Sequence, residues 1–175
     1  FHTVSFLTEA YYGPLIGLHD GGPDGDWVES FVQIAVIGRR ALEALAELQG
    51  FELDSFALPP AEQTPLEDLG LARLGAEIAR LPETDQMQEW QRNVLASLPH
   101  MLMRIGHYRQ WRNDAYCSDV AALTGAAPAG MADADSQLMA FIGRADASQD
   151  GAIARLLHRK LLRDCLIIAG PDPQP

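Results

Sequence analysis

The sequence predicts an all-α protein, an irregular bundle of six or seven helices that forms a single domain over residues 1–175. Apolar residues recur at the spacing of one helix face through most of the chain. Residues typical of helix N-termini precede several of these segments, and no run alternates polar and apolar residues between hairpin turns, as strands do. A chain of this length can bury a hydrophobic core without disulfides or metal ions.

Residues 1–25 are expected to form an N-terminal segment that ends in a loop rich in glycine and aspartate. Apolar residues in the segment 4–18 lie near helical spacing, although Gly13 and Pro14 interrupt it. The carboxylates of the loop, together with Asp26, could bind a hard cation such as Ca²⁺. Because glycine and aspartate are also the usual residues of tight turns, an ordinary turn is the expectation.

The first long helix is predicted from Trp27 to about Leu48. Asp26 and Glu29 fit a capping box, in which the two side chains accept backbone N–H groups at the start of a helix. Gly50 is the residue type that commonly follows the end of a helix. The first half of this helix is apolar almost all round, so we expect it to be buried on several sides.

A second capping box, formed by Thr64 and Glu67, begins the next predicted helix. Pro65 occupies the first helical position, where its missing N–H costs nothing. This helix is expected to end before Pro82, because proline cannot continue it.

Thr84 is expected to cap the following helix, which runs through Leu98. Pro99 then either kinks this helix or begins a new one that Ser97 caps. In both cases the helical pattern continues to about Leu123.

Two further helices complete the predicted bundle. Asp133 is expected to cap a helix that reaches Ile142, and Ser148 is expected to cap the last helix, which reaches Ile168. Residues 170–175 are rich in proline and are expected to form a flexible tail.

The chain is acidic, with 24 Asp and Glu against 13 Lys and Arg and a formal net charge of −11. A general nucleic-acid binder needs a basic face, so this balance argues against that class. No stretch approaches the roughly 18 consecutive apolar residues that a membrane helix needs, so no membrane association is expected.

A cytoplasmic location is expected because no signal peptide is visible and the chain has only two cysteines. Cys117 and Cys165 are expected to be free thiols, although a disulfide between them stays open. No nucleophile elbow or glycine-rich phosphate loop occurs, so catalytic residues stay unassigned and enzymatic activity stays open.

Two basic segments stand out in this acidic chain. Residues 90–113 hold four arginines and two histidines without an acid, and residues 151–163 are also free of acids. In the second segment arginines recur every four residues, which predicts one exposed ridge. Arginine forks and interleaved aromatic rings suit an acidic ligand or a protein interface. The predicted binding residues are Arg104, Tyr108, Arg109, Trp111, Arg112, Arg155, Arg159 and Arg163.

A structural role is the alternative for the same residues. The arginines could pair within the chain with the acidic N-terminal third, in surface ion pairs worth ~0–1 kcal/mol each. The two aromatic residues could equally pack in the core.

The first expectation is that the protein binds no cofactor, and a metal or haem site is the alternative. His100 and His107 lie seven residues apart, on one face of an unbroken helix. Glu89 and His19 could complete a set of ligands with them.

These patterns predict a helical accessory, adaptor or maturation protein that binds a partner protein, a second copy of itself or an acidic ligand. The alternative is a small helical enzyme or cofactor carrier with a histidine and carboxylate site between helices.

Overall fold

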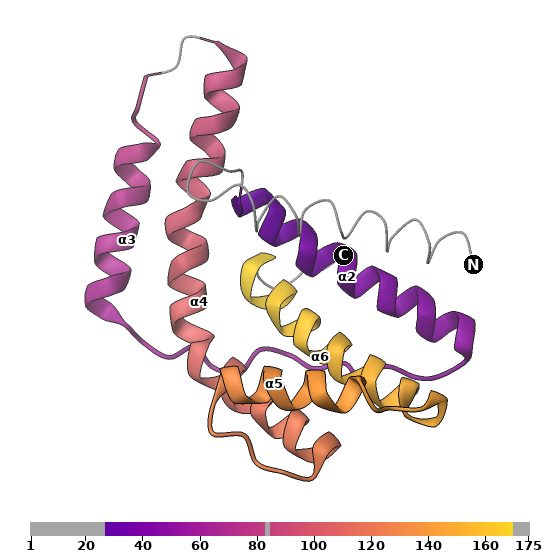
Figure 1. Cartoon of the computed structure of the whole chain (residues 1–175). Coiled ribbons are helices and arrows are strands. Elements are labelled where there is room, and N and C mark those ends of the chain that lie inside the picture. The colour runs from indigo at the N-terminus through magenta and orange to yellow at the C-terminus, as the bar shows by residue number, and fades with distance from the viewer. Residues whose placement is uncertain (1–26, 83–84, 170–175) are drawn as a thin grey trace. The chain divides into compact units, whose positions relative to one another are not determined.

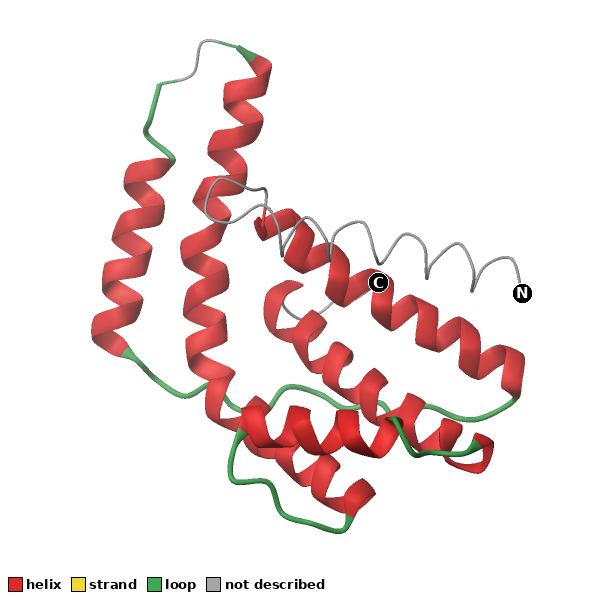
Figure 2. Cartoon of the chain, in the orientation of Figure 1, coloured by secondary structure: helices red, strands yellow, loops and turns green. Residues whose placement is uncertain are grey.

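The computed structural model describes residues 27–82 and 85–169, and these residues form helices without any strand (Figures 1 and 2). The predicted all-α class is therefore confirmed for this part of the chain, where no helix is long and apolar enough to cross a membrane. The described residues form five α-helices, so the expected count of six or seven is not confirmed, and a short 3-10 helix, η2, precedes the last one. They are α2 (Trp27–Gln49), α3 (Pro65–Ile78), α4 (Gln86–Thr124), α5 (Met131–Ile142), η2 (Ala147–Gln149) and α6 (Asp150–Ala169).

Several predicted features lie outside the described residues. These are the N-terminal segment and loop of residues 1–25, the cap at Asp26 and the tail at residues 170–175. Within the whole chain the contacts define two compact units, so the single-domain expectation is not confirmed.

The first unit combines Phe1–Ala57 with Gln110–Cys165. Its central hydrophobic cluster joins α4, α5 and α6. Figure 1 labels α2, α5 and α6, which belong to this unit together with the last part of α4. On α5 the buried residues follow a helical stripe, so this short helix packs through one face. The central cluster consists of Tyr116, Val120, Ala134, Leu138 and Leu156.

Helix α2 ends where the sequence predicts. Gly50 has a φ of +70°, the left-handed conformation that favours glycine. The backbone N–H of Phe51 donates to the carbonyl of Ala46 at 3.1 Å, which is the long hydrogen bond of a Schellman motif. The chain therefore turns sharply after α2, and the position of Phe51 is fixed by the turn.

The second unit, built mainly from Leu58–Arg109, contains α3 and the first part of α4 (Figure 1). The two helices approach closely at Gly75, where an added Cβ would lie 3.6 Å from the carbonyl oxygen of Ala96. Pro99 lies inside the continuous helix α4 and does not begin a new one. Accordingly, the Ser97 hydroxyl donates to the carbonyl of Val94 and does not cap a helix.

The predicted caps of α3 and α4 need correction. Thr64 precedes α3, yet its side chain makes no capping bond, so the expected box with Glu67 is wrong. The Thr64 hydroxyl donates instead to the Asp68 carboxylate, which draws it away from the backbone. Thr84 lies outside the described residues, and Asp85 accepts the backbone N–H at the start of α4.

The caps of the last two helices also differ from the prediction. Gly130 precedes α5, and Asp133 lies within the first turn, where its carboxylate accepts the backbone N–H of a residue before the helix. Ser148 does not cap α6, because its backbone N–H and hydroxyl both donate to Asp146. Asp146 caps η2, which leads directly into α6.

Candidate functional site

The arginines of α6 do not form the exposed ridge that the sequence predicts. Arg155 donates from Nε to the carbonyl of Glu52 at 3.0 Å, and its guanidinium lies 5.1 Å from the ring centroid of Phe51. Arg163, two turns further on, is buried. The expected exposure is wrong because the segment after α2 and the last part of α4 supply partners for these side chains.

A shared carboxylate on α4 neutralises two of these arginines. Asp119 lies 3.0 Å from Nε of Arg159 and 2.6 Å from Nη2 of Arg163. Arg159 also donates to Asp54 at 2.6 Å, across 105 residues of sequence. The alternative prediction, pairing with acids of the N-terminal third, is therefore confirmed for Asp54.

Aromatic rings complete the surroundings of Arg163. Its guanidinium lies 5.3 Å from the ring centroid of Phe56 and 6.0 Å from that of Trp111. The two rings meet edge to face, with their centroids 6.1 Å apart. Nε and Nη1 of Arg163 have no hydrogen-bond partner among the described residues, so the ring faces stabilise a charge that is otherwise poorly solvated.

The remaining predicted binding residues also make contacts within their own units. Arg112 pairs with Asp164 at 2.5 Å, and both belong to the first unit. In the second unit, Arg104 donates to the carbonyls of Leu166 and Ile167, near the end of α6, and its guanidinium lies 5.8 Å from the ring of buried Tyr108.

Arg109 alone among the eight is exposed without an ion pair to the described residues. The other seven have contacts that explain their presence structurally. An anion-binding role for them therefore stays a prediction without support from the contacts.

The residues predicted as metal ligands are not brought together in the described part of the chain. His107 lies 2.7 Å from Oδ1 of Asp68, whereas His100 and Glu89 are exposed. His19 lies outside the described residues. Among those that are described, no three His, Cys, Asp or Glu side chains could hold a metal ion.

The pair of His107 and Asp68 is nevertheless well formed. Burial alone would raise the pKa of Asp68, but hydrogen bonds from Thr64 and His107 hold that pKa below its usual value of 3.8. The pair connects the start of α3 to α4, so it helps to fix these two helices of the second unit against each other.

Both cysteines are free thiols, and Cys165 is buried.

His158 is a buried group on α6. It is 4% exposed, and its Nε2 lies 3.6 Å from Oε1 of Glu43 on α2. Burial lowers the pKa of His158, while the neighbouring carboxylates of Glu43 and Asp54 oppose that shift and Arg39 adds to it. The net effect is a pKa below the usual value of 6.5, for an imidazole that lies between α2 and α6.

We expect the free energy of unfolding to fall as the pH is lowered from about 7.5 to about 5.5. The unfolded chain protonates His158 near pH 6.5, whereas the folded chain resists protonation to a lower pH, so added protons favour unfolding. Urea denaturation across this range should show a shallower pH dependence for His158→Gln than for the wild type. The matched change at exposed His100, to glutamine, should leave the dependence as it is; equal slopes in all three proteins would contradict the assignment.

An exposed apolar surface lies on the helical hairpin of α3 and the first part of α4. Of the twelve large apolar residues that are exposed in the described chain, eight fall between Leu66 and Leu102. We call their side chains the hairpin surface. They are Leu66, Leu69, Leu74, Leu81, Met87, Trp90, Leu95 and Leu102.

The end of the hairpin near the start of α4 is hollowed. Asp85, Gln86, Met87 and Trp90 line this hollow, which is mainly apolar with a carboxylate at its edge. The sequence that carries the hairpin surface is acidic, with six Asp and Glu against three Arg between residues 66 and 102. Arg73 and Arg80 both pair with Glu77.

Comparison with known proteins adds no relative. The chain matches no protein-family model, no curated protein and no solved structure. The candidate sites are therefore defined by the residues and contacts of this chain alone.

Proposed function

We propose that this chain is a helical docking module that binds a basic amphipathic helix of a partner protein on the hairpin surface. The observation that carries the proposal is the concentration of exposed large apolar residues there, eight of twelve. Scattered apolar residues are normal on a protein surface, but their concentration on one supersecondary unit is typical of an interaction site. The expected cytoplasmic location remains part of this proposal.

Two neighbouring helices offer the geometry that a third helix needs. Side chains of α3 and α4 form ridges, and a partner helix can lay its apolar face between them. Trp90 and Met87 border the shallow hollow at one end, where a large apolar side chain of the partner would contact them. Tryptophan is among the residues that contribute most to binding at interfaces.

The charge of the hairpin favours a basic partner over a second copy of the chain. The acids Glu67 and Glu89 lie on α3 and α4 near opposite ends of the hairpin, and no ion pair joins either to a described residue. A second copy would bring like charges together, which costs free energy at an interface. Lysine or arginine residues along the edges of an apolar helix face would complement these acids.

The contacts do not favour the predicted binding of an acidic ligand by the arginines. Except for Arg109, these arginines are engaged with Asp119, Asp164, Asp54 and backbone carbonyls. A ligand carboxylate or phosphate would have to displace these internal partners. A docking surface made of exposed apolar residues requires no such exchange.

The test uses labelled helical peptides and the whole chain. A peptide of leucine and lysine with one apolar face should bind, and its binding is followed by fluorescence anisotropy. Trp90→Asp and Leu69→Asp should each weaken binding by about tenfold or more, because both place a charge on the hairpin surface. Met139→Asp, a similar change at an exposed residue of α5, should have little effect.

Two further peptides separate apolar docking from charge attraction alone. A peptide of the same composition with its leucines scattered around the helix should bind weakly, and an amphipathic leucine and glutamate peptide should not bind. Equal binding of the scattered peptide would contradict the proposal. Self-association that Trp90→Asp abolishes, measured by sedimentation, would replace the partner helix with a second copy.

A further inference from the structure

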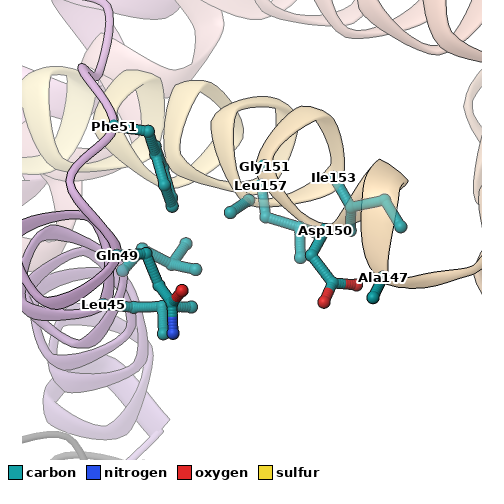
Figure 3. Close-up of a pocket in the computed structure, with 10 residues that line it drawn as sticks. Leu45, Gln49, Phe51, Ala147, Asp150, Gly151, Ile153 and Leu157 are labelled. Carbon is teal, nitrogen blue, oxygen red and sulfur yellow. The ribbon is translucent and has the colours of Figure 1, made fainter.

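A second apolar hollow lies in the first unit, between the end of α2 and the start of α6 (Figure 3). Its volume is about 500 Å³, within the range of small-molecule sites. Leu42 and Leu45 of α2 face Ile153 and Leu157 of α6, and Phe51 borders the same space. Small residues on the α6 side leave room, since a Cβ added at Gly151 would meet only Arg155, at 3.6 Å.

The wall at Phe51 is held in place before any ligand arrives. Gly50 turns the chain, and the backbone N–H of Phe51 is bonded to Ala46. The Arg155 guanidinium lies 5.1 Å from the centroid of the ring and donates to the carbonyl of Glu52. A preformed wall lowers the cost of binding, because fewer side chains must be ordered.

The polar groups at the opening select the kind of ligand. The carboxylate of Asp150 and the amide of Gln49 line the space beside the apolar chains (Figure 3). No hydrogen bond or ion pair joins the Asp150 carboxylate to a described side chain, so it is available to a ligand. No Lys or Arg is among the residues that line the hollow, and the guanidinium of neighbouring Arg155 is held by the carbonyl of Glu52 and the ring of Phe51.

We propose that this hollow binds a small organic ammonium ion with an apolar chain or ring on the order of eight carbon atoms. The apolar part fills the space between Leu45, Ile153 and Leu157, and the ammonium group meets Asp150 and the amide oxygen of Gln49. A carboxylate in the same position would face the negative charge of Asp150 and is rejected. This site is independent of the hairpin surface.

The first test compares three eight-carbon probes on the whole chain by calorimetry and by the rise in Tm. Octylammonium should bind, octanol should bind about tenfold more weakly, and octanoate should bind least. Asp150→Asn should remove the preference for octylammonium over octanol, whereas Glu47→Gln, on the exposed side of α2, should keep it. Equal affinity for octylammonium and octanoate would overturn the proposal.

A second variant tests the position of the site. Gly151→Leu fills the hollow at a helical residue where the backbone φ is ordinary, so the fold should be retained. It should abolish binding of both octylammonium and octanol, with an unchanged circular dichroism spectrum. Binding of octylammonium that survives Gly151→Leu would place the ligand elsewhere and would also overturn the proposal.

Discussion

Replacing Asp119 with alanine is expected to lower the free energy of unfolding by about 3 kcal/mol. Asp119 is the shared partner of Arg159 and Arg163, and the side chain of Arg163 is only 7% exposed. Without this carboxylate a buried guanidinium keeps its charge, because arginine does not lose its proton in proteins. The remaining ring contacts with Phe56 and Trp111 compensate for only part of that cost.

Urea denaturation, followed by circular dichroism, measures the effect. Asp54→Ala is the matched control: it removes the other carboxylate of Arg159, but Asp54 is 51% exposed, so the expected cost is below about 1 kcal/mol. The double variant Asp119→Ala, Arg163→Met should recover part of the loss, because it removes the unpaired buried charge. If Asp119→Ala cost no more than Asp54→Ala, the network would be a surface feature.

Local patterns explain why the helices could be predicted. The spacing of apolar residues and the stop at Gly50 are properties of neighbouring residues, so α2 ends as expected. The capping predictions at Thr64 and Ser148 were wrong because other groups compete for the same hydroxyls. Thr64 bonds to Asp68 and Ser148 to Asp146, and a single helix-start pattern does not distinguish these outcomes.

Long-range pairing explains what the sequence could not predict about the arginines. Arg159 meets Asp54 across 105 residues, and Arg163 meets Asp119 from a different helix. Periodicity on α6 correctly places Arg155, Arg159 and Arg163 on one stripe. It does not say whether that stripe faces water or another element, and the acidic segment after α2 was the only available indication.

The two candidate sites lie where sequence signals are weakest. A leucine such as Leu69 has the same helical spacing whether it faces a core or solvent, so the hairpin surface required the exposure of each side chain. The hollow at Phe51 depends on a turn after α2 and on a glycine and a packed arginine at the start of α6, two parts of the chain that are far apart in sequence. Neither arrangement has a motif that spacing alone reveals.

Replacing Tyr116 with alanine is the second change with a large expected effect, a loss of about 3 to 5 kcal/mol in the free energy of unfolding. The side chain is 1% exposed at the centre of the core cluster, so its removal leaves a cavity beside Val120 and Leu156. Tyr116→Phe keeps the ring and removes only the hydroxyl that donates to Asp135 at 2.7 Å. Its expected cost is about 1 kcal/mol, the usual net value of one hydrogen bond.

The difference between the two variants therefore separates packing from hydrogen bonding at one position. The Lys160 ammonium lies 4.5 Å from the ring centroid, and Tyr116→Phe keeps the ring that it contacts. Met139→Ala, at a residue of α5 that is 69% exposed, should cost less than about 0.5 kcal/mol and controls for lost apolar volume as such. Urea denaturation should show the smallest loss of stability for Met139→Ala, a larger loss for Tyr116→Phe and the largest loss for Tyr116→Ala, each relative to the wild type. A loss in Tyr116→Phe as large as in Tyr116→Ala would assign the effect to the hydrogen bond with Asp135.

Burial and the hydrogen bond to Asp135 together raise the pKa of Tyr116. The phenol should therefore resist ionisation until the chain unfolds, which ultraviolet titration can follow.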